Sequence, residues 1–255
     1  MRGTTKDWSH EIVNTQDRKA VRSLSETGRE LLGILESYEK IGFVNVAGLC
    51  AALDLPKITL VTFSCLASIR GKQELQLDLL KTFFFRSRKF AAGQKLLADL
   101  NAITPTRLIV ILPDLEPKRT WGWDIEEDEL TCACELMIDD AREKLPDGFD
   151  VVCWSHLETD PREYQRALLW ALEPTQRILV HQEAEHLREY PDILFPDGVD
   201  VSARKQVAAY AHEGRQLEKL HPHAILVQSE FPPERKDKMY QPLRNRPLPI
   251  IHPFE

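Results

Sequence analysis

Three continuous apolar runs constrain the fold of this chain more than any other feature of its sequence. The runs are ITLVTF at 58–63, RLIVIL at 107–112 and DVVCW at 150–154, and apolar and polar residues do not alternate within them. Strands of this kind are buried on both faces, which is typical of a parallel sheet covered by helices. Two weaker runs, at 224–228 and 248–251, are further strand candidates.

Helical patterns surround and separate these runs. Apolar residues recur at helical spacing over residues 25–40, 44–54, 72–100, 125–144, 161–172, 176–190 and 201–220. Strands and helices that alternate in this way predict an α/β fold, namely a single Rossmann-like three-layer domain with a mostly parallel central sheet, over residues 23–255. Ser25 is expected to cap the first helix, and the polar residues 1–22 are expected to form a flexible N-terminal arm.

The composition narrows the class of protein. The 255 residues include 33 Lys and Arg against 40 Asp and Glu, a net charge of −7, so we expect no DNA-binding coat. No apolar stretch approaches the ~18 residues that a membrane span requires, so we expect no membrane partner. The five cysteines are an odd number, and the N-terminal residues lack the apolar core of a secretory signal. These features predict a cytoplasmic protein.

Candidate site residues follow three of the predicted strands. Because the carboxyl ends of parallel strands meet at one edge of the sheet, we expect these side chains to converge on one crevice. They are Ser64, Asp114, Ser155 and His156. Ser64 has two readings at this point: its hydroxyl caps the following helix, or it is presented to a ligand.

The sequence predicts no cofactor and no metal. No G-x-G-x-x-G follows any predicted strand, and no P-loop lysine motif occurs. The stretch HQEAEH at 181–186 lacks a third clear ligand and reads as a surface helix.

The order of the segments over residues 55–255 resembles that of the tRNA-dependent cyclodipeptide synthases. LVTFSCLAS at 60–68 resembles the family's strand that ends in the nucleophilic serine. DVVCWSHLETDPREYQRAL at 150–168 resembles a strand of the family with the serine-containing loop and the helix that follow it. AILVQSEFPP at 224–233 is similar to the segment with the catalytic glutamate, and PIIHPF at 249–254 to the closing strand with its tyrosine–histidine pair.

The sequence departs from the bacterial members of that family in several places. The position of the family's tyrosine, four residues before its glutamate, is occupied here by Leu226. In the closing strand Ile251 replaces the family's tyrosine, while the histidine is kept as His252. The arginine-rich helix corresponds to 128–144, which is acidic here. The chain is therefore more similar to the fungal branch that makes arginine-containing cyclodipeptides.

That resemblance implies an enzyme that uses two aminoacyl-tRNAs, arginyl-tRNA and a second one, and releases a diketopiperazine through an acyl-serine on Ser64. No ATP, metal or redox cofactor is needed, because a tRNA ester is already activated. Glu230 is the candidate carboxylate for the α-ammonium group, with Glu213 as its rival. Three residues compete as proton relay, namely Tyr210, Tyr240 and His252.

The arginine side chain calls for a carboxylate pocket, because guanidinium–carboxylate pairing is bidentate and charge-assisted. Asp114 and Glu116 are the candidates, and Trp123 could close the site with a stacking face. The alternative is that this acidic loop is solvated and its tryptophans pack inward.

Binding of tRNA falls to the basic stretch 79–98, which holds five bases and no acid. Phosphate contacts are expected from Arg86, Arg88, Lys89 and Lys95; the alternative is a solvated helix face. Two other classes of function stay open: an α/β transferase that uses a nucleotide-linked donor, and a non-catalytic Rossmann-like module that only binds tRNA.

Overall fold

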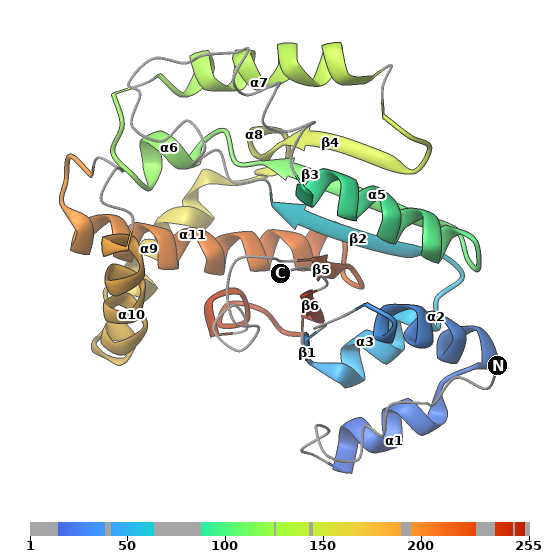
Figure 1. Cartoon of the computed structure of the whole chain (residues 1–255). Coiled ribbons are helices and arrows are strands. Elements are labelled where there is room, and N and C mark those ends of the chain that lie inside the picture. Colours follow the sequence, from blue (N-terminus) through green and yellow to red (C-terminus); the bar gives the residue numbers. More distant parts are fainter. Residues whose placement is uncertain are drawn as a thin grey trace.

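A mostly parallel sheet forms the middle of the molecule (Figure 1). The computed structural model describes residues 15–38, 42–63, 88–124, 126–142, 145–189, 195–227, 238–246 and 248–252. Within these ranges six strands lie in the order β1-β6-β5-β2-β3-β4. Their bounds are β1 Gly42–Val44, β2 Ile58–Phe63, β3 Thr106–Leu112, β4 Phe149–Cys153, β5 Ile225–Val227 and β6 Ile250–His252.

Helices precede, connect and follow the strands. On the N-terminal side of β3 are α1 Thr15–Ser23, α2 Glu26–Glu36, α3 Val46–Leu53 and α5 Arg88–Asn101. After β3 come α6 Glu116–Arg119, α7 Glu127–Arg142, α8 Trp154–Leu157, α9 Pro161–Ala171, the 3₁₀ turn η3 Pro174–Gln176, α10 Arg177–Arg188 and α11 Val199–Leu220. None of the helices in the described ranges is long and apolar enough to cross a membrane.

The strands confirm the prediction of a mostly parallel sheet. β2 pairs in parallel with β3, and β3 with β4, while β5 pairs in parallel with β2 and with β6. Only β1, among the described strands, is antiparallel, with Phe43 opposite Ile251. The chain runs from β2 to β3 and β4 on one side, then returns to β5 on the other side of β2. Ligands in such sheets bind at the carboxyl ends of the strands near this reversal.

Both faces of the sheet are buried, which explains why the strands show no alternation. Leu60 and Leu108 belong to the core on the first face, which is covered by α2, α3, α5 and α7. Val61 and Ile109 belong to the core on the second face, which is covered by α9 and α11. The result is the three-layer α/β architecture expected from the continuous apolar runs.

Local signals set several helix boundaries. The Ser25 hydroxyl accepts a hydrogen bond from the Gly28 amide at 2.9 Å, which confirms the predicted cap of α2. Ser25 also donates to the Asp54 carboxylate at 2.6 Å, so the start of α2 is fastened to the end of α3. Asp160 accepts from the Arg162 amide at 3.0 Å, and Pro161 occupies the first turn of α9, where a missing amide proton costs nothing.

The predicted elements agree with the structure at the strands and differ at short segments. The three strong strand runs lie within about one residue of β2, β3 and β4. Of the helix expected over 72–100, the structure describes the part from residue 88 onward, which is α5. The strand β1 and the short helices α6 and α8 have no counterpart in the prediction. Helix α1 includes residues 15–22 of the expected N-terminal arm, and residues 1–14 lie outside the described ranges.

Candidate functional site

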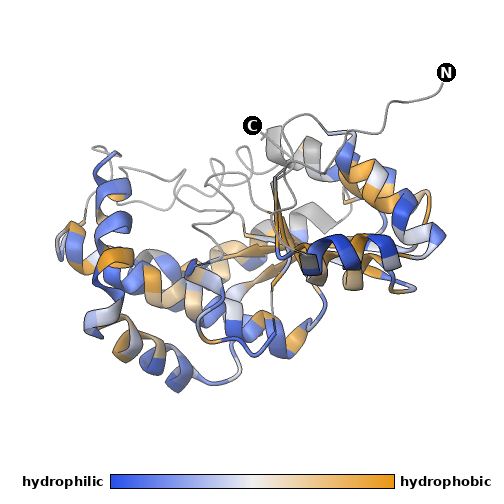
Figure 2. Ribbon diagram, turned by 90° about the horizontal axis from the view of Figure 1, so that it is seen from below, coloured by the Kyte–Doolittle hydropathy of each residue, from blue (hydrophilic) through white to orange (hydrophobic). Residues whose placement is uncertain are grey.

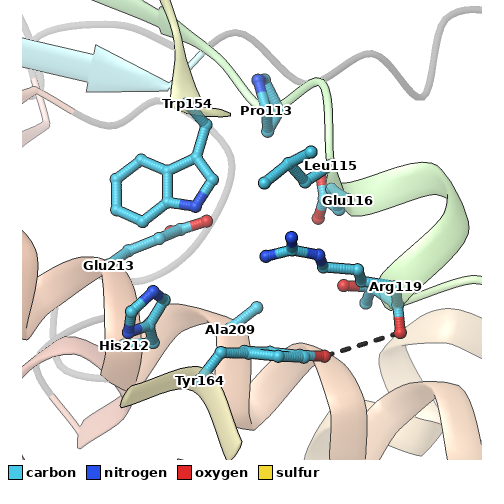
Figure 3. A pocket seen from close by; sticks show the side chains of 10 residues that line it. Pro113, Leu115, Glu116, Arg119, Trp154, Tyr164, Ala209, His212 and Glu213 are labelled. Carbon is cyan, nitrogen blue, oxygen red and sulfur yellow. Dashed lines mark hydrogen bonds between the residues drawn. The ribbon is translucent and has the colours of Figure 1, made fainter. Parts of the chain in front are cut away.

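A pocket opens where β3 and β4 end (Figure 3). It has a volume of about 300 Å³, counting the open space at its mouth. Pro113, Leu115 and Glu116 line it after β3, and Trp154 lines it after β4. The opposite wall comes from α9 and α11, and the end of α6 contributes Arg119 and its C-cap residue Thr120. The pocket therefore lies at the edge of the sheet where the fold predicts a ligand site.

A partly buried ionic network supports one wall of the pocket. The Arg119 guanidinium donates to both oxygens of Glu158, at 2.8 and 2.9 Å, and to both oxygens of Glu127, at 2.9 and 3.1 Å. Burial alone would raise the pKa of Glu158, but hydrogen bonds from His212 and Arg119 outweigh it and hold that pKa below its usual value. Arg119 is thus matched by two carboxylates and adds no net positive charge to the pocket.

His212 connects this network to α11. Its Nε2 lies 3.2 Å from Glu158 Oε1, and its ring contacts Trp154 and Tyr164 edge-on, with centroids 5.7 and 5.9 Å away. Only 2% of its side chain is exposed, and its Nδ1 has no hydrogen-bond partner in the part of the chain that the structure describes. His212 is therefore held rigidly in the pocket wall by contacts on several sides.

Two tyrosines and a glutamate form a second buried group beside the pocket. The rings of Tyr210 and Tyr240 are 5.2 Å apart, and Glu213 lies on the same helix as Tyr210. Burial raises the pKa of Tyr240 well above its usual value, and the nearby charge of Glu213 adds to this effect. Tyr240 therefore stays protonated at neutral pH and can donate a hydrogen bond.

The end of β2 meets this group. The ring of Phe63, the last residue of β2, stacks on Tyr240 at 6.0 Å and contacts Trp154 at 5.9 Å. The carboxyl ends of β2 and β4 therefore lie against the same aromatic wall, which is continuous with the pocket through Trp154.

Gly214 explains how Tyr240 reaches this position. A Cβ atom at Gly214 would lie 2.1 Å from the Tyr240 carbonyl oxygen, so only glycine lets the backbone around Tyr240 approach α11 this closely. Arg244 then donates to the Gly214 carbonyl at 2.6 Å. Glu218, one turn further along α11, accepts from the amides of Asn245 at 3.0 Å and Arg246 at 2.8 Å. Residues 238–246 are thus fastened to the C-terminal half of α11.

Several predicted site residues lie outside what the structure describes. Ser64, Glu230 and Arg86 fall in undescribed segments. His252, Arg88 and Lys89 are described in their backbones, at the end of β6 and the start of α5. Of the predicted proton relays, Tyr210 and Tyr240 come together with Glu213, the rival carboxylate.

Asp114 and Ser155 meet, as expected for residues at adjacent strand ends. Asp114 is fully buried and accepts from the Ser155 amide at 3.0 Å, the Ser155 hydroxyl at 2.6 Å and the Thr131 hydroxyl at 2.6 Å. These bonds connect the end of β3 to α8 and α7. Of the two predicted arginine-binding carboxylates, Glu116 is the one that lines the described pocket.

The remaining predicted residues lie elsewhere on the molecule. Trp123 is 9% exposed and packs against Trp121 in the core of the first face, with centroids 4.9 Å apart. His156 is exposed on α8 and lies 2.8 Å from the Glu135 carboxylate of α7. Lys95 pairs with Asp99 at 2.5 Å.

The network of Arg119, Glu158 and His212 was not among the predicted site residues. The only local signal was Asp160-Pro161, which marks the start of α9 and so a turn directly after Glu158. Nothing in the sequence alone indicated that these three residues, which come from separate segments, would meet. No group of three or more His, Cys, Asp or Glu side chains that could hold a metal occurs among the described residues.

Comparison with known proteins gives a likeness in fold. No protein-family model matches the sequence, and no curated protein matches it. Tyrosyl-tRNA synthetase from Archaeoglobus fulgidus, solved with L-tyrosine, superposes on 90% of this chain with a TM-score of 0.52 and 14% identity. The match spans 64% of that synthetase, less than two thirds of its length.

Two further structures are similar at lower scores. Tryptophanyl-tRNA synthetase from Plasmodium falciparum covers 91% of this chain and 61% of its own, with 10% identity and a TM-score of 0.42. The PvcA protein from Pseudomonas aeruginosa covers 87% of this chain and 81% of its own, with 13% identity and a TM-score of 0.38. The chain therefore has a Rossmann-like fold of the kind found in the first of these three proteins.

Proposed function

We propose that this protein is an aminoacyltransferase that joins two aminoacyl-tRNAs into a cyclodipeptide, with Ser64 as the acyl carrier. One observation carries the proposal: Phe63, which directly precedes Ser64, stacks on Tyr240 and contacts Trp154. Those two aromatic residues belong to the wall that also holds Tyr210 and Glu213. A nucleophile, a carboxylate and phenols are the groups that ester aminolysis requires.

The chemistry balances without a cofactor. The Ser64 hydroxyl attacks the ester carbonyl of the first aminoacyl-tRNA, and the ribose oxygen of the tRNA leaves with the proton. The amine of the serine-bound residue attacks the second ester, releasing the second tRNA. The new terminal amine then attacks the serine ester, which closes the ring and restores the hydroxyl. Two aminoacyl-tRNAs give one diketopiperazine and two free tRNAs.

The described residues fit particular roles in this reaction. Glu213, the rival carboxylate of the sequence analysis, is now assigned to hold the α-ammonium group and accept its proton, because it lies beside Tyr210 and Tyr240; Glu230, the first candidate, is the alternative. Tyr240, whose pKa is raised, is assigned to donate a hydrogen bond to the ester oxygen as charge develops on it. Tyr210 lies within 5.2 Å of Tyr240 between ring centroids and supports it, and His252 is the alternative relay.

The charge of the pocket favours a cationic substrate. Glu116 and Glu213 line it, and the one lining Arg or Lys among the described residues, Arg119, is already paired with Glu127 and Glu158. An arginyl group suits such a pocket, with Glu116 as its carboxylate partner. Asp114 is the alternative, although its oxygens already accept three hydrogen bonds. Contacts to tRNA phosphate stay assigned to Arg86, Arg88, Lys89 and Lys95, and the reaction belongs in the cytoplasm, where aminoacyl-tRNAs are used.

Mass spectrometry of medium from a heterologous host that expresses the protein tests this proposal. We expect new arginine-containing diketopiperazines, absent from a host that expresses Ser64→Ala. Incubation with radiolabelled arginyl-tRNA should leave label on the parent protein and on the matched control Ser68→Ala, but not on Ser64→Ala. Product without any labelled protein would exclude the acyl-serine. Binding of tRNA with no product would favour a binding module, and a strict requirement for Mg²⁺ and a nucleotide-linked donor would favour the other transferase class.

A further inference from the structure

Two exposed surfaces of this chain carry opposite charge, and each contains exposed apolar side chains. The first, the basic corner, is formed by the end of α9 and the start of α10. Leu169, Leu172 and Ile178 are 67%, 55% and 74% exposed there, within ten residues of each other along the chain. Several large aliphatic side chains exposed within so short a segment are a feature of contact surfaces.

Three arginines flank the apolar residues of the basic corner, against two acidic residues, Glu163 and the exposed Glu173. Arg162 and Arg166 lie on the exposed face of α9 at positions i and i+4, with Leu169 at i+7, and Arg177 directly precedes Ile178. Arg166 is 3.8 Å from Glu163, while Arg162 and Arg177 make no side-chain ion pair within the described ranges. An apolar centre with an arginine-containing rim is typical of a protein–protein interface.

The second surface, the acidic face, is one side of α7. Asp128, Glu129, Cys132 and Leu136 are all exposed on it at helical spacing, and Leu136 is 52% exposed. Asp128 and Glu129 make no ion pair with another described residue. The acidic face therefore offers negative charge around one apolar side chain, the complement of the basic corner.

The two surfaces cannot meet within one molecule. In Figure 1, α7 lies along the top of the view and α10 at the lower left, with α6 and α11 between them. Figure 2, coloured by hydropathy, shows apolar residues interspersed with polar ones along the outer helices. The basic corner and the acidic face can therefore contact each other only between two molecules.

We propose that this protein associates with itself head to tail, the basic corner of one molecule docking on the acidic face of the next. Because the two surfaces differ, the contact is heterologous and can continue from chain to chain or close into a ring. RNA is the less suitable occupant of the basic corner, since phosphate contacts would leave the three aliphatic side chains in water. The proposal does not depend on the chemistry assigned to the pocket.

Sedimentation velocity over a range of protein concentrations tests this contact with neutralising variants. The corner variant is Arg166→Gln with Ile178→Gln, and the α7 variant is Glu129→Gln with Leu136→Gln. We expect the parent to form oligomers that dissociate on dilution and in high salt, and each variant alone to be monomeric. In an equimolar mixture, the intact basic corner of the α7 variant can still dock on the intact acidic face of the corner variant. The mixture should therefore give a 1:1 dimer and nothing larger.

The matched control is Lys57→Gln with Arg22→Gln, which removes two exposed cations elsewhere and should leave the oligomers unchanged. Thermal unfolding confirms that each variant is folded. A parent that is monomeric at every concentration overturns the proposal. An α7 variant that still associates with itself would also overturn the proposal. Its acidic face is altered, so its contact would have to join two basic corners. Loss of tRNA binding by the corner variant, with association unchanged, would also overturn it and identify the corner as an RNA contact.

Discussion

The two faces of the sheet have different compositions, although both are buried. The first face, under α2, α3, α5 and α7, is packed mainly with aliphatic residues such as Leu60, Leu96 and Leu108. The second face, under α9 and α11, contains Trp154, Tyr164, Tyr210 and Tyr240, and α11 also buries His212, Glu213 and Gln216. Buried polar groups cost free energy unless they are paired, so a stable protein concentrates them where they have a function.

This difference indicates a division of roles. The first face supplies stability through apolar burial and needs no particular chemistry. The second face gives up part of that stability to hold ionisable groups around the pocket. Substitutions on the first face should therefore lower stability and leave activity unchanged. Substitutions on the second face should lower activity more than stability.

The largest expected effect is loss of activity at Glu213, on the second face. We expect Glu213→Gln to lower cyclodipeptide formation by about 10³-fold, because the amide cannot hold the ammonium group by charge or accept its proton. Folding stability should change by less than about 1 kcal/mol or rise, since a buried charge is removed. Product yield by mass spectrometry and thermal unfolding measure the two quantities.

Glu185→Gln on the exposed surface of α10 is the matched control and should change neither quantity. Unchanged product formation by Glu213→Gln would remove Glu213 from the mechanism and leave Glu230 as the carboxylate.

The next effect is loss of stability on the first face. Leu60 is fully buried, so Leu60→Ala should lower the free energy of unfolding by about 2–5 kcal/mol. Product formed per folded molecule should stay near that of the parent. Urea unfolding measures the stability, and Val201→Ala, at a residue 38% exposed, is the control and should change it by less than about 0.5 kcal/mol. A large drop in specific activity would contradict the division of roles.

A smaller effect, on both quantities, is expected at Gly214. The added Cβ of Gly214→Ala must displace the Tyr240 backbone, which should cost about 1–3 kcal/mol and lower activity by moving the Tyr240 phenol. Gly33→Ala is the matched control, since a Cβ there meets nothing within 4 Å, and it should raise stability by up to about 1 kcal/mol through helix propensity. Equal behaviour of the two variants would show that the close approach at α11 is unimportant.

The smallest effect concerns the acid stability of the segment that carries Tyr240. Burial acts to raise the pKa of Glu218, but hydrogen bonds from the Asn245 and Arg246 amides outweigh it and lower that pKa below its usual value. A carboxylate with a lowered folded-state pKa contributes stability above its unfolded pKa of about 4.3 and loses it as the pH falls through the folded value. Glu218→Gln should therefore be less stable than the parent at pH 7, by about 1 kcal/mol.

That difference should shrink as the pH falls below about 4, because the parent then loses the same interaction. Thermal unfolding from pH 7 down to pH 3 measures this trend, with Glu30→Gln on the exposed surface of α2 as control. A difference that stays constant with pH would mean that the charge of Glu218 does not fasten the segment.

The sequence by itself determined the framework of this fold. Strands β2, β3 and β4 were readable because burial on both faces makes most residues of a strand apolar, and such runs stand out. The caps at Ser25 and Asp160 act on amides two or three residues away, so they too are local properties of the sequence. The expectation that ligands bind where these strands end follows from the parallel order alone.

Only the tertiary structure decided which side chains form the pocket wall. Arg119, Glu158 and His212 lie in three separate segments, and from the sequence each reads as an ordinary charged or polar residue. Tyr240 packs against Tyr210 because the missing Cβ of Gly214 lets the Tyr240 backbone approach α11. A single glycine within a helical sequence does not indicate such a contact. Likewise β1 spans only Gly42–Val44, and three residues are too few to show a strand period in the sequence. They form a strand because they pair with the open edge of β6. Local patterns record local and periodic forces, whereas the site depends on contacts between distant segments that no short stretch of sequence contains.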